Sequence, residues 1–336
     1  MSGMPPLLRL PGLAGIEPPY GGRDQVAHLN GFPVRCLARS IMISRRTFVA
    51  GGFAMVGAVA APPLLSAAGG RFNNLVESFA RLEKDNNGRL GVAVVDTGSG
   101  DSIGYRKDER FAMCSTFKML LAAAVLERVD EGKEKLDRTI AIVATGFLPN
   151  SPVSLEHAGG SMTIRELSAA IVTRSDNTAA NLLLASIGGP PGITRFARSL
   201  GDTVTRLDRV ETALNEALPG DPRDTTSPAA MVANMRVLLV GNRLSQGSRE
   251  QLIEWLMANK TGDERIRAGL KRGWRVGDKT GSNGENTTND VAIIWPGHRA
   301  PVLVAAYLTV CAGPEPKRNA VLAQVGREVA ECIGAS

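Results

Sequence analysis

The order of predicted strands and helices is the feature that most restricts how this chain can fold. Residues 71–84 carry apolar side chains at helical spacing, and residues 89–96 and 102–106 follow with the composition of a β-hairpin. The C-terminal part contains three further strands and a closing helix, at 274–279, 290–295, 302–310 and 319–333. Strands divided between the two ends of the chain, with helices beside them, indicate an α+β fold.

The middle of the chain is predicted to be helical. Helical periodicity occurs in five segments: 117–129, 163–173, 178–187, 228–239 and 248–258. Residues 200–227 form a polar stretch, and a loop of that length inside a compact domain usually has a function. We therefore predict an α/β sheet domain, residues 71–113 and 259–336, interrupted by an all-α domain, residues 114–258, with the active site in the crevice between them.

Composition and charge narrow the function classes. The chain is 43% hydrophobic and 21% charged, as expected for a globular protein. The formal net charge is +6, but residues 1–68 carry +4 of it, so no nucleic-acid partner is predicted for the main body. Because His28, His157 and His298 are scattered and no C-x-x-C or H-x-H pattern occurs, neither a metal site nor another cofactor is expected.

The N-terminal region has the features of an export signal. Residues 44–49 (SRRTFV) read as a twin-arginine motif, an apolar run follows, and small residues up to Ala68 offer a cleavage site. The run is short and interrupted by prolines, so no stable membrane anchor is predicted. We expect residues 42–68 to be a signal peptide for the twin-arginine export machinery, and the mature chain to be a periplasmic or secreted monomer. Residues 1–41 are a doubtful extension, with Met42 as an alternative start.

The first reactive motif is Ser115-x-x-Lys118, at the start of the apolar helix 117–129. Residues three apart share one face of a helix, so Lys118 can approach the Ser115 hydroxyl and, if its pKa falls, accept a proton from it. Taken alone, the pattern is more often a helix cap followed by a surface lysine than a catalytic pair.

Two further motifs follow in the sequence. Ser175-Asp176-Asn177 separates two predicted helices, where a capping turn is the alternative interpretation. The second, Lys279-Thr280-Gly281, ends a predicted strand. A lysine and a threonine there offer a charge and a hydroxyl to an anion, and the glycine allows another backbone or a ligand to approach closely.

Together and in this order, the three motifs resemble the signature of class A serine β-lactamases and penicillin-binding proteins. The resemblance extends over about residues 71–335 and includes the segments 175–184 and 208–217. It implies a five-stranded antiparallel sheet flanked by helices. It also implies that Ser115 is the nucleophile and that Lys118 and Ser175 carry protons.

A fourth motif separates the two enzyme types. Arg209-x-Glu211-x-x-x-Asn215 resembles the omega loop of the β-lactamases, here residues 206–224. In that family the matching glutamate activates the deacylating water, and the matching asparagine helps to hold the water. The resemblance also implies an ion pair between Arg209 and Asp224 that closes the loop. Because only a hydrolase needs a base that acts on the acyl-enzyme, the motif favours a β-lactamase.

The same resemblance implies a set of substrate contacts: Lys279, Thr280, Gly281 and Ser282 around the substrate carboxylate, and Asn177 and Asn215 at its acylamide side chain or the water. Many members add an arginine to the carboxylate subsite. Thr288 stands where one common form carries it, whereas segment 261–267 resembles members that place the arginine there. We therefore assign this role to Arg265.

The cysteines add one departure from the family. Cys114 precedes the nucleophile, as in members with carbapenemase activity, but the position of its usual disulfide partner holds Asn283. That bridge is therefore not expected, and any pairing among Cys114, Cys311 and Cys332 stays open.

The sequence thus predicts hydrolysis of penicillins and cephalosporins through a serine acyl-enzyme, and so antibiotic resistance. One alternative is a penicillin-binding D,D-peptidase acting on cell-wall peptides, which has no need of Glu211. Another is a non-catalytic receptor that sequesters the drug, which would be expected to lose Lys118 or Glu211. Whether Lys118 or, through a water, Glu211 accepts the proton during acylation also stays open.

Overall fold

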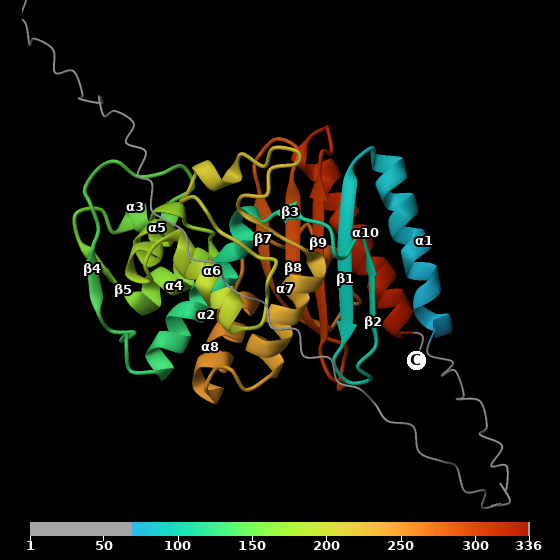
Figure 1. Ribbon diagram of the computed structural model, residues 1–336, viewed down its shortest axis with the longest axis horizontal. Coiled ribbons are helices and arrows are strands. Elements are labelled where there is room, and N and C mark those ends of the chain that lie inside the picture. The colour runs from blue at the N-terminus through green and yellow to red at the C-terminus, as the bar shows by residue number, and fades with distance from the viewer. Residues whose placement is uncertain (1–68, 335–336) are drawn as a thin grey trace, which may run out of the picture. The chain divides into compact units, whose positions relative to one another are not determined.

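A five-stranded antiparallel sheet lies at the centre of the fold. The computed structural model describes residues 69–334, and the strands of its sheet lie in the order β2-β1-β9-β8-β7 (Figure 1). Their bounds are β1 Arg89–Asp96, β2 Ser102–Tyr105, β7 Arg275–Ser282, β8 Thr288–Trp295 and β9 Val302–Thr309. Strands from the two ends of the sequence therefore form one sheet, which confirms the predicted α+β class.

The alternation of side chains along the strands gives this sheet two apolar faces. On β1, Leu90, Val92 and Val94 join one buried cluster, while Ala93 joins the other. The cluster that contains Leu90 also includes side chains of α1 (Gly69–Asn86) and α10 (Glu315–Gly334). These two helices cover one face of the sheet. Burial on both faces explains why the central strands have nearly continuous apolar sequences.

Helices cover the other face of the sheet. At their centre is α2 (Phe117–Asp130), in which every residue from Phe117 to Leu126 is buried. Four helices pack against it: α4 (Ile164–Thr173), α5 (Asn177–Ser186), α6 (Pro190–Ser199) and α8 (Gln246–Met257). A helix enclosed in this way needs apolar residues around its whole circumference, which the sequence of α2 supplies. Helix α7 (Pro228–Met235) packs directly on β1 and β9.

Some boundaries differ from those predicted. Helix α6 lies outside the predicted helices because Gly188-Gly189-Pro190-Pro191 has turn composition. Here the prolines occupy the first turn of the helix, where a missing N–H breaks no hydrogen bond. The predicted helix 228–239 divides into α7 and a π-helical turn, Arg236–Val240.

Short elements complete the described part of the chain. They are β3 (Phe111–Ala112) paired with β6 (Thr225–Thr226), β4 (Thr139–Ala141) paired with β5 (Ser161–Thr163), and the helices α3 (Pro152–Glu156) and α9 (Ile266–Gly269). The described residues belong to one compact unit, and the division into a sheet domain and an all-α domain stays a prediction. Within residues 69–334, no helix has the length and apolarity that crossing a bilayer requires. The predicted extension and signal peptide, 1–41 and 42–68, lie outside the described residues.

Candidate active site

Ser115 and Lys118 lie at the start of the central helix. Ser115 belongs to a 3-10 turn, Cys114–Thr116, that leads directly into α2. One turn later, the fully buried Lys118 donates a hydrogen bond from Nζ to Ser115 Oγ at 3.0 Å. The three-residue spacing therefore places the lysine in direct contact with the serine hydroxyl.

The loop between α4 and α5 brings Ser175 and Asn177 to the same lysine. Lys118 Nζ donates to the Ser175 carbonyl oxygen at 2.9 Å and to Asn177 Oδ1 at 2.5 Å. It also lies 3.4 Å from Ser175 Oγ. Asp176 has a different role, because its carboxylate caps α5 by accepting from Ala179 N. The middle residue of the motif thus fixes the loop that presents the other two.

Strand β7 closes this polar cluster from the side of the sheet. Lys279 Nζ donates to Ser175 Oγ at 3.1 Å and to the Thr280 carbonyl oxygen at 2.9 Å. Gly281 passes close to the turn that carries the serine, since a Cβ at this position would lie 2.7 Å from the Met113 carbonyl oxygen and 3.2 Å from Ser115 N. Only glycine allows this approach without a backbone shift.

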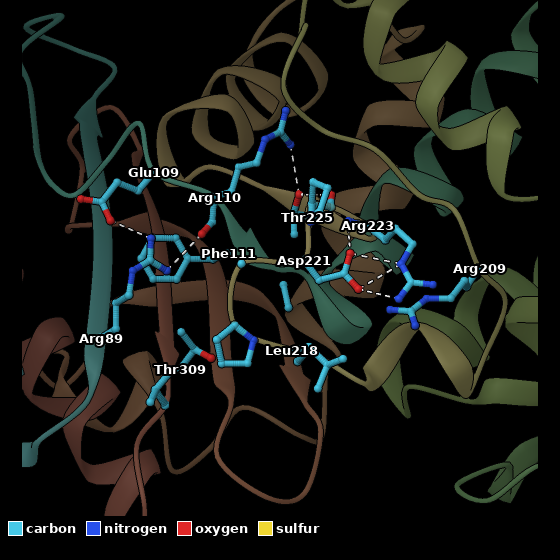
Figure 2. Close-up of a pocket in the computed structure, with 16 residues that line it drawn as sticks. Arg89, Glu109, Arg110, Phe111, Arg209, Leu218, Asp221, Arg223, Thr225 and Thr309 are labelled. Carbon is cyan, nitrogen blue, oxygen red and sulfur yellow. Dashed lines mark hydrogen bonds and ion pairs between the residues drawn. The ribbon is translucent and has the colours of Figure 1, made fainter.

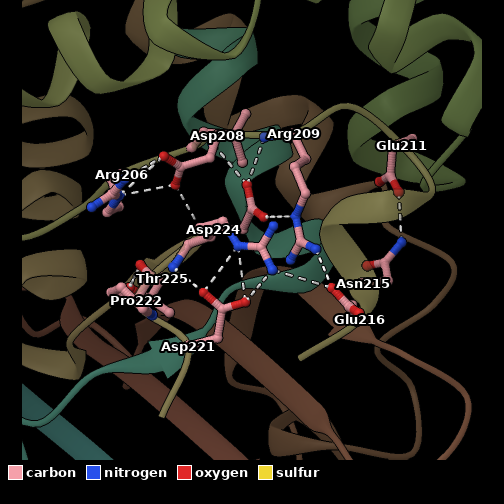
Figure 3. Close-up of polar contacts among 12 residues, drawn as sticks. Arg206, Asp208, Arg209, Glu211, Asn215, Glu216, Asp221, Pro222, Asp224 and Thr225 are labelled. Carbon is pink, nitrogen blue, oxygen red and sulfur yellow. Dashed lines mark hydrogen bonds and ion pairs between the residues drawn. The ribbon is translucent and has the colours of Figure 1, made fainter. Parts of the chain in front are cut away.

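The loop 206–224 brings a carboxylate to the cluster. Glu211 Oε1 lies 2.8 Å from Lys118 Nζ and accepts from Ser115 Oγ at 3.4 Å. Its other oxygen accepts from Asn215 Nδ2 at 2.6 Å (Figure 3). Within residues 69–334, the buried Asn215 Oδ1 has no hydrogen-bond partner. It can therefore accept a hydrogen bond from a bound molecule.

A surface pocket opens beside these groups. Its lining comes from three separate parts of the chain and includes Pro149, Thr212, Asn215, Ser282 and Asn283. A hydroxyl in contact with a buried lysine and a buried carboxylate is an arrangement suited to nucleophilic catalysis, because either group can receive the hydroxyl proton. The pocket gives a small molecule a place beside Asn215, which contacts Glu211, and beside Ser282 at the end of β7.

The sequence and the fold have close counterparts among known proteins. Residues 74–333 match the model of the Beta-lactamase enzyme family. β-Lactamase L2 of Stenotrophomonas maltophilia is 47% identical over 303 residues, which are 87% of this chain and 100% of that protein. β-Lactamase CTX-M-8 of Citrobacter amalonaticus is also 47% identical, over 77% of this chain and 89% of its own length.

Solved structures agree with this. An ancestral Gram-negative class A β-lactamase is 61% identical, with a TM-score of 0.75 over 76% of this chain and 99% of its own. A β-lactamase from Xanthomonas campestris is 50% identical, with a TM-score of 0.76 over 78% of this chain and 98% of its own.

The chain belongs to the class A serine β-lactamases. As a member of this family it is a hydrolase, and the five-stranded sheet with flanking helices is the fold of its structural relatives.

Burial controls the charge of both lysines in the β-lactamase site. It lowers the pKa of Lys118, while the carboxylate of Glu211 opposes that shift. It also holds the pKa of Lys279 well below its usual value, and repulsion from Lys118 and then Arg265 adds to this effect. A lowered pKa makes a lysine neutral more often near neutral pH, and only the neutral amine can accept a proton as a general base.

Lys279 makes the stability of this β-lactamase depend on pH. Between the lowered pKa and the ordinary 10.5, the unfolded chain binds a proton that the folded chain does not, so the folded state gains stability as pH rises. We expect Lys279→Met to be more stable than the wild type near neutral pH. The difference should shrink by about 1.4 kcal/mol per pH unit within that window.

Urea unfolding of both proteins at several pH values between neutral and 10.5 would measure this difference. The exposed Lys260 provides the control, because Lys260→Met should show no such trend. A difference between the wild type and Lys279→Met that stays constant over this range would contradict the prediction.

Ion pairs hold the omega loop of the β-lactamase (Figure 3). Arg209 Nε lies 2.6 Å from Asp224 Oδ2, and Asp224 Oδ1 accepts from the backbone N–H groups of Asp208 and Arg209 at 2.7 and 2.9 Å. Arg209 also pairs with Glu216. The structure thus brings Arg209 and Asp224 together as the resemblance implies, with the carboxylate buried at the base of the loop.

We expect Asp224→Asn to loosen this loop. The amide can still accept from the backbone, but the partly buried Arg209 loses its buried charged partner and keeps only the half-exposed Glu216, which should reduce the free energy of unfolding by about 1–3 kcal/mol. Proteolysis within residues 206–224 should become faster, and urea unfolding would give the stability change. Asp221→Asn is the matched control, since its partner Arg223 is exposed to solvent and the pair should contribute little.

Arg265 lies behind β7 and has no direct contact with Ser115 or Lys118. Its guanidinium donates to the carbonyl oxygen of Gly281 at 3.0 Å, and the side chain is only 4% exposed. Its charge still acts on the site, as the pKa of Lys279 shows. Thr280 is linked to the same region, because its hydroxyl lies 2.5 Å from that of Thr261.

The cysteines of the described chain are not joined to one another. Within residues 69–334, no disulfide joins Cys114, Cys311 and Cys332. Burial raises the pKa of the Cys114 thiol to about 12, so the neighbour of the nucleophile is an unreactive apolar residue.

Sequence reasoning did not assign two asparagines that hold the site together. Asn181 on α5 donates to the Glu211 carbonyl oxygen and accepts from Glu211 N, both at 2.9 Å. Asn150 donates to the Ser175 carbonyl oxygen at 2.9 Å. Asn181 falls within the family-like segment 175–184, and its position there is the signal that could have found it.

A cavity separates the outer arm of the omega loop from the sheet (Figure 2). Residues 217–223 form one wall, and the ends of β1, β3 and β9 form the other. The Arg89 guanidinium lies 3.9 Å from the centre of the Phe111 ring and pairs with Glu109. These contacts belong to the wall of the cavity on the side of the sheet.

Proposed function

We propose that this β-lactamase hydrolyses penicillins and cephalosporins through an ester on Ser115, and thereby gives resistance to these antibiotics. The observation that carries the proposal is the position of Glu211. Its carboxylate reaches Ser115 Oγ and Lys118 Nζ together and is held by Asn215. A base in this position can act on an ester of Ser115.

In acylation, Ser115 Oγ attacks the lactam carbonyl carbon, an ester forms and the ring C–N bond breaks. The hydroxyl proton passes to Lys118, which is 3.0 Å away, or through a water to Glu211. Ser175, whose hydroxyl lies within reach of both lysines, returns a proton to the leaving nitrogen. The N–H groups of Ser115 and Ser282 stabilise the oxyanion.

The substrate carboxylate binds at the end of β7. Lys279, Thr280 and Ser282 supply the contacts, and Gly281 leaves room for the strand to lie against the serine turn. Arg265 acts here through its charge. Asn177 contacts the acylamide side chain of the substrate, and Asn215 contacts that side chain or the deacylating water.

In deacylation, Glu211 takes a proton from a water that attacks the ester carbonyl, and Ser115 leaves with a proton restored. Asn215 Oδ1, buried without a partner within residues 69–334, is suited to hold that water. We also propose that the protein is exported by the twin-arginine machinery and acts as a monomer in the periplasm or outside the cell, where these drugs arrive.

Steady turnover of nitrocefin tests the proposal. A β-lactamase hydrolyses many equivalents, whereas a D,D-peptidase or a drug-sequestering receptor would release one equivalent at most and then stop. A single stoichiometric burst without continued hydrolysis would overturn the proposed function.

A further inference from the structure

Arg265 carries a buried positive charge that is oriented mainly by neutral groups. Its Nε donates to Asn319 Oδ1 at 2.9 Å, and its Nη1 donates to the carbonyl oxygens of Gly281 and Asn289 at 3.0 and 2.8 Å. These acceptors fix the plane of the guanidinium between β7, β8 and α10. Because they are uncharged, they leave most of its charge uncancelled.

Among residues 69–334, Glu315 is the carboxylate that pairs directly with Arg265. It is the first residue of α10, and its Oε1 lies 3.0 Å from Arg265 Nη2, with 48% of its side chain exposed. The pair lines a surface pocket together with Thr261, whose hydroxyl contacts that of Thr280. The ion pair thus lies beside the end of β7, where Arg265 donates to the Gly281 carbonyl oxygen and where the substrate carboxylate binds in the proposed function.

We propose that Glu315 is a specificity-determining residue: by neutralising part of the charge of Arg265, it limits how strongly the site attracts anionic β-lactams. This inference rests on the function proposed above, in which the Arg265 charge attracts the substrate carboxylate. The carboxylates of Glu315 and of the substrate then interact with the same guanidinium, so Glu315 weakens the attraction of Arg265 for the substrate. Since Glu315 is half exposed and screened by water, its effect is a few-fold.

Glu315→Gln tests this directly, because glutamine keeps an oxygen that can accept from Arg265 Nη2 and removes only the charge. We expect kcat/KM for a β-lactam with a free carboxylate to rise about three-fold, with kcat unchanged. The methyl ester of the same β-lactam should show no rise, and the gain for the acid should shrink in high salt. Steady-state hydrolysis at two ionic strengths measures all of these effects.

Glu331→Gln is the matched control. It makes the same change in net charge on the same helix, but Glu331 lines a different pocket, between α1 and α10, and should leave kcat/KM unchanged. An unchanged kcat/KM in Glu315→Gln, or an equal rise for the acid and the ester, would overturn the inference.

Failure of the proposed function would look different. If Arg265→Gln does not lower kcat/KM for the acid relative to the ester, the charge of Arg265 has no part in binding. If the wild-type protein shows no steady hydrolysis, the proposed reaction itself is refuted. A lower kcat/KM in Arg265→Gln together with no change in Glu315→Gln would refute only the role of Glu315.

Discussion

Replacing Glu211 with alanine is expected to stop the reaction at the acyl-enzyme, with steady-state hydrolysis of a penicillin reduced about 10³-fold. The reason is that the water attacking the ester loses its base, while Ser115 keeps its contact with Lys118 at 3.0 Å. Intact-protein mass spectrometry after mixing with a penicillin should show the mass of the protein plus one drug molecule, persisting long after the wild type has returned to its free mass.

A second carboxylate of the same loop provides the control for this variant. Glu216 pairs with Arg209 and makes no hydrogen bond or ion pair to Ser115 or Lys118, so Glu216→Ala should keep turnover within about ten-fold of the wild type and accumulate no adduct. Rapid turnover in Glu211→Ala would show that another group activates the water.

Replacing Ser115 with alanine should abolish covalent chemistry, with hydrolysis falling by about 10⁴-fold or more. No adduct should appear in the mass spectrum at any time. The substitution removes only the Ser115 hydroxyl oxygen. Lys118 keeps the Ser175 carbonyl oxygen, Asn177 Oδ1 and Glu211 as hydrogen-bond acceptors. The fold and the noncovalent affinity for substrate should therefore persist.

Thermal unfolding and equilibrium binding of a penicillin to Ser115→Ala separate a lost nucleophile from a lost fold. A melting temperature close to that of the wild type, together with measurable binding, would assign the effect to chemistry. Hydrolysis at the wild-type rate in this variant would refute the assignment of Ser115 as the nucleophile.

The strands could be predicted from sequence because their signal is local, whereas their assembly into a five-stranded antiparallel sheet was implied by the family resemblance. In β1, successive residues such as Val92 and Ala93 belong to opposite clusters, and strand composition alone places the strand at Arg89–Asp96. The pairing of Ser115 with Lys118 is local too, since it follows from helical spacing. Helix α6 was missed because Gly188 and Gly189 precede the two prolines that begin it.

The rest of the site depends on contacts between distant segments. The hydrogen bond between Ser115 and Glu211 joins residues 96 positions apart, and no helical or strand periodicity encodes it. Only the resemblance to a family placed Glu211 there. The contacts of Arg265 could not be predicted from sequence either. The family resemblance assigned an arginine to the carboxylate subsite, but the orientation of its guanidinium and its pairing with Glu315 depend on how α10 packs against the sheet.

The cavity behind residues 217–223 has a consequence for how the enzyme can diversify. Side chains that line a cavity are not interlocked with a core, so changing them leaves no new void and incurs little of the usual stability loss. Mutations in this arm are therefore expected to accumulate under drug selection more readily than mutations in α2. The arm can therefore vary in sequence among natural lineages while the buried lysines and the central helix remain unchanged.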